Sequence, residues 1–272
     1  SATQALLLGV FLYWGWDTAM SVNEETHAPA KTPGRSILIA TAALVGCYVM
    51  VAVALQAFAG TAALGGEDAG EDVFAVVAEP LLGSAGVTVL SIMVIVSAAA
   101  ALATTILPSS RTVFAMASYR AAPRLFGRTN SHGTPSVATI GIGVAGCAFY
   151  VGMAAISDNM LADSILSISM AICVYYAITG LTSAVWFARS ARGASALLTS
   201  VLLPGIGGLL MLLVLIRSAW DMADPEYGDT SLLGIGGALL IGAGSLLVGL
   251  GFMASWARLE PSFFRTHDRV DA

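Results

Sequence analysis

Residues 5–26 of the chain read ALLLGVFLYWGWDTAMSVNEET, and this stretch decides the fold class. Its apolar segment contains one charged side chain, Asp17, and no other acidic or basic residue precedes Glu24. An ionised carboxylate at membrane depth costs about 2.5 to 3.5 kcal/mol, so it normally faces a cavity, a partner or a ligand rather than lipid. Asp17 is therefore the first candidate functional residue.

The composition of the whole chain agrees with a membrane setting. Of the 272 residues, 57% are hydrophobic and 11% are charged, which is more hydrophobic than a water-soluble domain requires. Apolar stretches of about 20 residues, enough to cross a bilayer as a helix, predict seven spans, at 2–22, 37–58, 86–116, 136–156, 165–188, 196–216 and 232–256. They show little of the alternation that a membrane barrel requires. The sequence predicts an all-α membrane protein.

The first of these segments is predicted to be a broken helix. Glycine weakens a helix interior, and Gly15 lies between two tryptophans directly before Asp17. A break there makes Asp17 or Thr18 the N-cap of a second half-helix that runs to about Thr26, with backbone groups exposed at midplane. Two interpretations of Asp17 stay open: it carries a proton or binds a ligand ion, or it only caps the half-helix.

The charges between the segments predict the orientation, because cytoplasmic loops retain Lys and Arg. Basic residues gather in alternate connections and in the tail, with Arg217 alone on the other side; they are Lys31, Arg35, Arg111, Arg120, Arg124, Arg128, Arg189, Arg192, Arg258, Arg265 and Arg269. The other connections are acidic, and Asp158 and Asp163 are placed in one of them. We therefore expect an outer N-terminus, a cytoplasmic C-terminus and no nucleic-acid partner.

Several motifs resemble the amino acid, polyamine and organocation permease superfamily. Residues 13–17 (YWGWD), followed by residues 23–26 (NEET), Pro29, Pro33 and Arg35, resemble its sixth span and the following loop. Residues 109–111 (SSR), 115–117 (AMA), 123–126 (PRLF) and 133–135 (GTP) resemble the end of its eighth span and the adjoining connection. Tyr175, Tyr176 and residues 186–189 resemble its tenth span.

The resemblance implies a fragment of a LeuT-type transporter of twelve spans, built on two inverted five-helix repeats. Residues 1–190 would be the second repeat, residues 191–257 the two C-terminal spans, and residues 258–272 a cytoplasmic tail. The N-terminal five spans of the same protein would be missing, so this chain alone is not expected to transport.

The resemblance also implies the position of the substrate site. In the superfamily, unwound backbone and aromatic side chains of the sixth span hold the substrate, and the matching positions are Phe11, Tyr13, Trp14, Gly15, Trp16 and Asp17. Thr105 beside Pro108, and Tyr175, are further candidates for lining the pathway. The hydroxyl of Thr105 has an alternative role, which is to bond back to its own helix. Of Tyr175 and Tyr176, we expect one at most to face the pathway.

Glu25 and Arg111 are candidates for a cytoplasmic gate, since salt bridges that form in one state of a carrier hold that state. The alternative is a solvated loop of weak ion pairs. The cysteines and histidines show no ligand spacing. We expect no disulfide, no metal and no cofactor.

The function predicted from these observations is a secondary transporter, or permease, in the cytoplasmic membrane. It would move amino acids or related amines such as polyamines by alternating access, with proton coupling or exchange. A seven-span sensory receptor or a non-transporting membrane module is the alternative, but the single lysine, Lys31, lies in a loop and excludes a retinal Schiff base in the last span. No nucleophile with a base and no metal cluster points to an enzyme.

Overall fold

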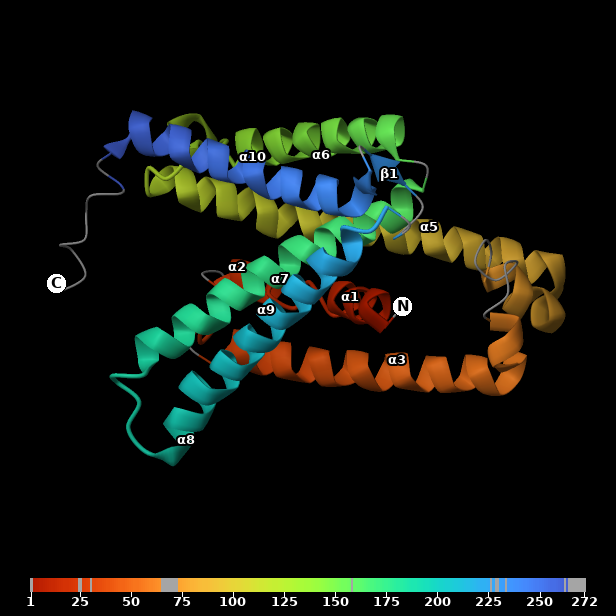
Figure 1. Ribbon diagram of the computed structural model, residues 1–272. Helices are drawn as coiled ribbons and strands as arrows, with labels where there is room; N and C mark the ends of the chain where they lie inside the picture. The colour runs from red at the N-terminus through yellow and green to blue at the C-terminus, as the bar shows by residue number, and fades with distance from the viewer. Residues whose placement is uncertain are drawn as a thin grey trace. The chain divides into compact units, whose positions relative to one another are not determined.

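A computed structural model of the chain describes residues 2–23, 26–29, 31–64, 73–157, 159–225, 227, 230–232, 234–261 and 263. The described part is almost entirely helical, which confirms the predicted all-α class (Figure 1). Its helices and strands are α1 (Ala2–Leu12), α2 (Thr18–Ser21), α3 (Thr32–Leu64), α5 (Val73–Ser118), η2 (Arg124–Gly127), α6 (Ser136–Ile156), α7 (Met160–Phe187), α8 (Ala194–Leu197), η3 (Leu198–Leu202), α9 (Leu203–Met222), β1 (Ser231–Leu232), β2 (Ile235–Gly236) and α10 (Gly237–Leu259).

Six of the described helical stretches are long and apolar enough to cross a membrane. They correspond to the second to seventh predicted spans, and α8, η3 and α9 together form one of them. Many of their apolar side chains are exposed, for example Leu38, Ile95 and Phe252. Such surfaces suit contact with lipid. The protein is therefore a multi-pass membrane protein.

The first predicted span is not a continuous helix, as the Gly15 break predicted. Helix α1 stops at Leu12, and the second half-helix, α2, has only four residues. The expectation that this half-helix runs to about Thr26 was wrong. It ends at Ser21 because Val22 leaves the helical conformation, with φ of −108° and ψ of 18°.

The start of the last predicted span also differs from the structure. Residues 231–236 form a small antiparallel hairpin in which Ser231 pairs with Gly236 and Leu232 with Ile235. Gly234, at the turn, has a φ of +77° that suits glycine. The helix therefore begins at Gly237 rather than at residue 232.

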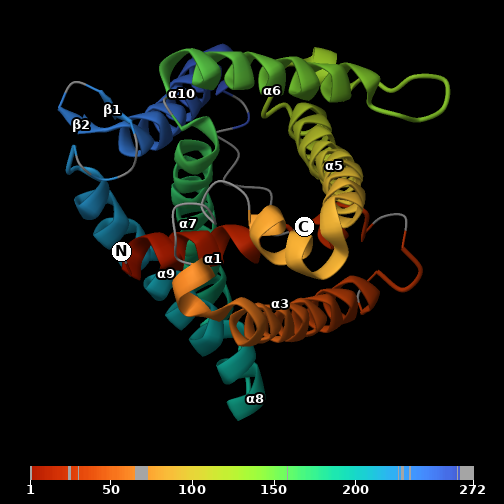
Figure 2. The same ribbon diagram turned by 90° about the vertical axis from the view of Figure 1, so that its right-hand side faces the viewer.

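The chain divides into two compact units, and the division falls inside the broken span. One unit contains residues 1–14, 118–123 and 143–272; the other contains residues 15–117 and 124–142. In the first unit, α7 and α9 lie side by side, and α1 and α10 also pack against α7 (Figure 2). In the second unit, α2 packs against α3.

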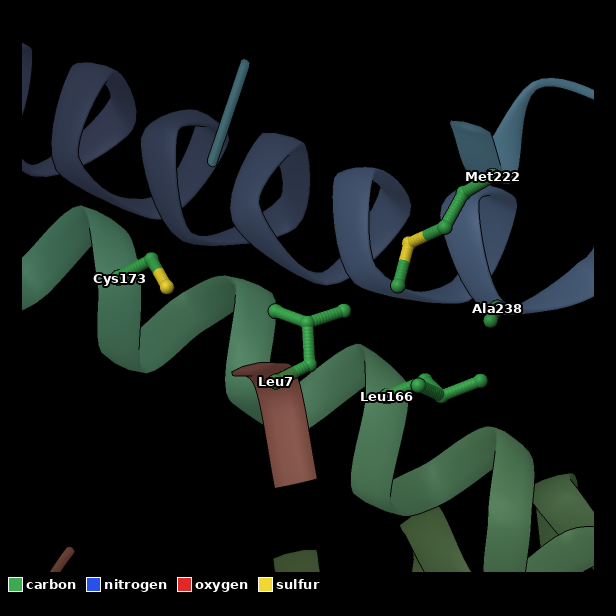
Figure 3. Packing of buried hydrophobic residues seen from close by; sticks show 5 residues of the cluster. All are labelled: Leu7, Leu166, Cys173, Met222 and Ala238. Carbon is green, nitrogen blue, oxygen red and sulfur yellow. The ribbon is translucent and has the colours of Figure 1, made fainter. Parts of the chain in front are cut away.

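The core of the first unit is a cluster of apolar side chains from four helices. Leu7 of α1, Leu166 and Cys173 of α7, Met222 of α9 and Ala238 of α10 gather in one place (Figure 3). Leu7, Cys173 and Met222 are completely inaccessible to solvent. Burial of a Leu or Met side chain is worth about 1.5 to 3 kcal/mol. Helix α1, the first half of the broken span, is thus an integral part of this core.

Glycines let α7 and α9 approach closely. A Cβ on Gly208 would lie 2.9 Å from the amide nitrogen of Leu181 and 3.1 Å from the carbonyl oxygen of Ala177. One on Gly180 would lie 2.6 Å from the carbonyl oxygen of Pro204. The glycine-rich sequence of α9 therefore serves close helix packing of the kind common in membranes.

Candidate functional site

The break between α1 and α2 is a turn built on residues 13–17. The α1 hydrogen-bond pattern ends where the amide of Tyr13 donates to Gly9 O at 3.1 Å and that of Trp14 donates to Phe11 O at 3.1 Å. Gly15 has a φ of +104°, outside the range that other residues readily adopt. The amide of Thr18 then donates to Gly15 O at 3.1 Å and starts α2.

Two backbone donors at this turn have no partner among the residues that the structure describes. Within the described part of the chain, the amide nitrogens of Gly15 and Asp17 donate to no acceptor. Unsatisfied backbone amides in a membrane segment are expensive unless water, protein or a ligand accepts from them. The turn therefore offers two hydrogen-bond donors to an anionic group.

Asp17 occupies the N-cap position of α2, but its side chain does not cap the helix. The residue has helical backbone angles, with φ of −70° and ψ of −14°, and its carboxylate makes no capping hydrogen bond. The carboxylate is partly exposed. A purely capping role for Asp17 would require a hydrogen bond from its carboxylate to a backbone amide of α2, and that bond is not formed.

Aromatic side chains surround the turn in sequence and differ in burial. Phe11 and Tyr13 are half-buried, while Trp14 and Trp16 are each 40% exposed. Phe11, Tyr13 and Trp14 belong to the first compact unit, and Gly15, Trp16 and Asp17 belong to the second.

Thr105 lies in the second unit, on α5, and its hydroxyl is used within its own helix. It donates to Ala101 O at 2.9 Å. The neighbouring hydroxyls do the same: Ser109 donates to Thr105 O at 2.8 Å and Ser110 to Leu107 O at 2.9 Å. The hydroxyl of Thr105 is thus bonded within its own helix, and a place for this residue along the pathway stays a prediction.

Tyr175 lies in the first unit, on α7, next to Tyr176. Tyr175 is 51% exposed, whereas Tyr176 is partly buried. Their ring centroids are 5.1 Å apart and the rings are tilted by 43°. The two tyrosines thus differ in exposure, and the expectation that at most one of them faces the pathway stays a prediction.

Arg111, one of the two gate candidates, contacts the half-helix α2. Its NH1 atom donates to the carbonyl oxygen of Ser21, the last residue of α2, at 3.3 Å. Glu25, the other gate candidate, lies outside the described residues. Arg120 forms an ion pair with Glu260 at 3.8 Å.

Two polar contacts of the first unit were missed from the sequence. Asp163, which we placed in an outer loop, lies in the first turn of α7 and is only 1% exposed. Ser157 donates to its Oδ2 at 2.7 Å, and its Oδ1 has no partner in the described part of the chain. Thr3 of α1 donates to Asp221 of α9 at 2.5 Å. The only sequence signal for Asp163 was its position four residues before Ser167 at the edge of an apolar segment.

A comparison with protein families decides among the classes of membrane protein. The family model described as amino acid permease matches residues 2–243, and thus most of the chain. The chain belongs to the amino acid permease family. No curated protein and no solved structure matches the chain significantly.

Membership of this family confirms the resemblance to the amino acid, polyamine and organocation superfamily. Together with the six long apolar helices, it identifies the protein as a membrane transporter. The match begins at residue 2 and therefore includes the whole broken span of this permease.

Proposed function

We propose that this permease is part of a secondary carrier that moves amino acids across the cytoplasmic membrane by alternating access. The observation that carries the proposal is the break at residues 13–17, where aromatic side chains and a carboxylate flank a turn inside an apolar segment. A broken helix at membrane depth is a site for a small polar ligand.

The substrate in this proposal is held by both backbone and side chains. The unpaired amides of Gly15 and Asp17 donate to its carboxylate. The faces of Trp14 and Trp16 attract its ammonium group by cation–π interaction. Phe11, Tyr13, Thr105 and Tyr175 are further residues that we propose for substrate binding. A polyamine, which has no carboxylate, would leave the two amides unused.

Asp17 is proposed as the residue that couples transport to a proton. Its side chain makes no capping hydrogen bond at the break, and a positioned carboxylate is a group that can take up and release a proton. Arg111 and Glu25 are proposed as parts of the cytoplasmic gate. The same proposal includes five further spans, which complete the superfamily architecture. It also places residue 2 on the outer side of the membrane and the C-terminal tail in the cytoplasm.

Uptake into proteoliposomes tests the proposal. The full natural protein is compared with Asp17→Asn and Asp17→Glu on a panel of radiolabelled amino acids and polyamines, with and without an inward proton gradient. We expect the gradient to stimulate uptake of at least one amino acid in the parent and in Asp17→Glu. We expect Asp17→Asn to lose that stimulation, because it has no titratable group.

The outcomes separate the parts of the proposal. No uptake of any amino acid by the folded parent would contradict the carrier function. Equal stimulation of the parent and Asp17→Asn would leave the carrier but remove the coupling role of Asp17. Uptake of polyamines but not of amino acids would show that the substrate class is polyamines.

A further inference from the structure

The first turn of α1 carries a hydrogen bond to a carboxylate far away in the sequence. Thr3 Oγ1 donates to Asp221 Oδ2 at 2.5 Å, across 218 positions of sequence. The other carboxylate oxygen, Oδ1, accepts from Arg217 NH2 at 2.9 Å, one turn earlier on α9. Both oxygens of Asp221 are thus engaged, and the first half of the broken span is joined to α9.

This use of a threonine hydroxyl differs from the usual one in membrane helices. Thr88, Thr179 and Thr199 donate back to carbonyls four residues earlier in their own helices, which is the common arrangement. The Thr3 hydroxyl instead donates its hydrogen bond to a side chain on another helix. A hydrogen bond to an ionised acceptor is stronger than one between neutral groups.

Burial shields this bond from water. Thr3 is 7% exposed, and the side chain of Asp221 is 16% exposed. The side chain of Arg217 is 68% exposed, so the ion pair on the other side of the carboxylate is screened. The Thr3–Asp221 contact is therefore the more protected of the two that Asp221 makes.

The same face of α1 is fixed by apolar contacts one turn further on. Leu7, four residues after Thr3, enters the cluster that contains Met222, the residue next to Asp221 (Figure 3). Apolar packing alone permits sliding and rotation of a helix, since it has no direction. A hydrogen bond has a preferred distance and angle, and it selects one rotation of α1.

The end of α1 that follows this fixed face leads into the proposed substrate site. Tyr13, the first residue after α1, follows Thr3 by ten positions, which is about 15 Å along a helix axis. A rigid helix transmits a rotation at one end to the other, where Phe11, Tyr13 and Trp14 begin the break.

We propose that Thr3 and Asp221 are positioning residues, whose hydrogen bond fixes α1 and thereby the outer side of the substrate site. This inference rests on the proposed function for the identity of the site. It assigns a role in substrate affinity to two residues that do not belong to the break.

Kinetics of the full natural protein in proteoliposomes test the inference. Thr3→Val keeps the shape of the side chain and removes the donor, and Thr3→Ser keeps the donor. Because the lost bond is to a charged acceptor, we expect Thr3→Val to raise the KM for the transported amino acid about tenfold. We expect a smaller change in kcat and recovery of the parent KM in Thr3→Ser.

A double-variant cycle and two controls make the test specific. Asp221→Ala and the Thr3→Val/Asp221→Ala double variant should have the same KM, since the bond is already lost in either single variant. Arg217→Gln, which keeps the Thr3 contact, should change the KM much less. Thr199→Val, at an exposed hydroxyl bonded within its own helix, should leave it unchanged.

Spin labels give a readout that does not depend on transport. Cysteines replacing Leu8 of α1 and Leu213 of α9, which are 44% and 61% exposed, would carry the labels, with Cys47 and Cys147 replaced by serine. Cys173 is fully buried and would not be labelled. The inter-label distance should be narrow in the parent and in Thr3→Ser, and broader in Thr3→Val.

Each result decides one question. A parent that takes up no amino acid contradicts the proposed function, and the spin-label distances alone then decide whether the bond positions α1. An unchanged distance distribution in Thr3→Val overturns the inference. A broader distribution with an unchanged KM in Thr3→Val overturns the link to the substrate site. A Thr3→Val protein that loses only thermal stability, with its KM unchanged, overturns that link as well.

Discussion

Arg111 of α5 donates a hydrogen bond to the carbonyl oxygen of Ser21, at 3.3 Å, where α2 ends. The last carbonyls of a helix have no donor within it, so the guanidinium satisfies a group that the helix leaves open. The second half of the broken span, α2, is thus held by α5 within one compact unit. The first half, α1, packs against α7 and α9 within the other.

Loss of the Arg111 contact should slow transport. We expect Arg111→Gln to reduce the initial uptake rate roughly fivefold or more, because a hydrogen bond from a charged donor is lost. Arg111→Lys, which keeps a charged donor, should be less impaired. Arg128→Gln, at an exposed position, is the matched control, and equal rates for Arg111→Gln and Arg128→Gln would contradict a gate role.

The backbone of the break predicts opposite effects for two glycines of the same span. Gly15→Ala meets no steric obstacle, but it forces alanine to a φ of +104°, which costs about 1 to 3 kcal/mol. Gly9→Ala, in the interior of α1 with open space around it, should be neutral or stabilising by about 0.5 to 1 kcal/mol. Thermal unfolding of the purified protein in detergent measures both. A Gly15→Ala protein as stable as Gly9→Ala would show that the turn is not under this constraint.

Close packing of α7 and α9 predicts a similar contrast further along the chain. Gly208→Ala places a methyl group 2.9 Å from the Leu181 amide nitrogen, so we expect a loss of about 1 to 3 kcal/mol. Gly207→Ala has open space and should gain a little stability from better helix propensity. Equal melting temperatures for the two variants would exclude the tight contact.

The buried carboxylate of Asp163 depends on the hydroxyl of Ser157. Ser157→Ala removes the donor at 2.7 Å and leaves the 1% exposed acid without a side-chain partner among the described residues. We expect a destabilisation of about 1.5 to 3 kcal/mol, the worth of a hydrogen bond to a charged group. Ser245→Ala, at an exposed hydroxyl on α10, should stay within about 0.5 kcal/mol of the parent. Thermal unfolding distinguishes these outcomes.

Much of the fold could be predicted because a bilayer imposes a simple rule on the sequence. Apolar stretches of spanning length predicted each of the six long helices, and Gly15 predicted the break in the first segment. Helix boundaries were less accurate. The last helix is shorter than predicted because residues 231–236 form a hairpin with a positive φ at Gly234. These residues are as apolar as the helix that follows, so composition alone did not reveal the turn.

The candidate site was predicted in part. The break, its aromatic residues and Asp17 could be read from a contiguous motif. The contacts of Arg111 with Ser21 and of Thr3 with Asp221 could not, because they join positions 90 and 218 apart in the chain. Asp163 was misplaced, since a charge at the edge of an apolar segment gives the same pattern in a loop and in a buried first turn.

The sequence by itself determined that the chain is a helical membrane protein with a broken span, because lipid accepts only apolar side chains and satisfied backbone. It also determined the family, through motifs that are local in the chain. Only the tertiary structure decided which helix holds each half of the broken span, which hydroxyls bond within their own helix, and which carboxylates are buried. Those choices depend on distances between residues remote in sequence, and no local pattern encodes them.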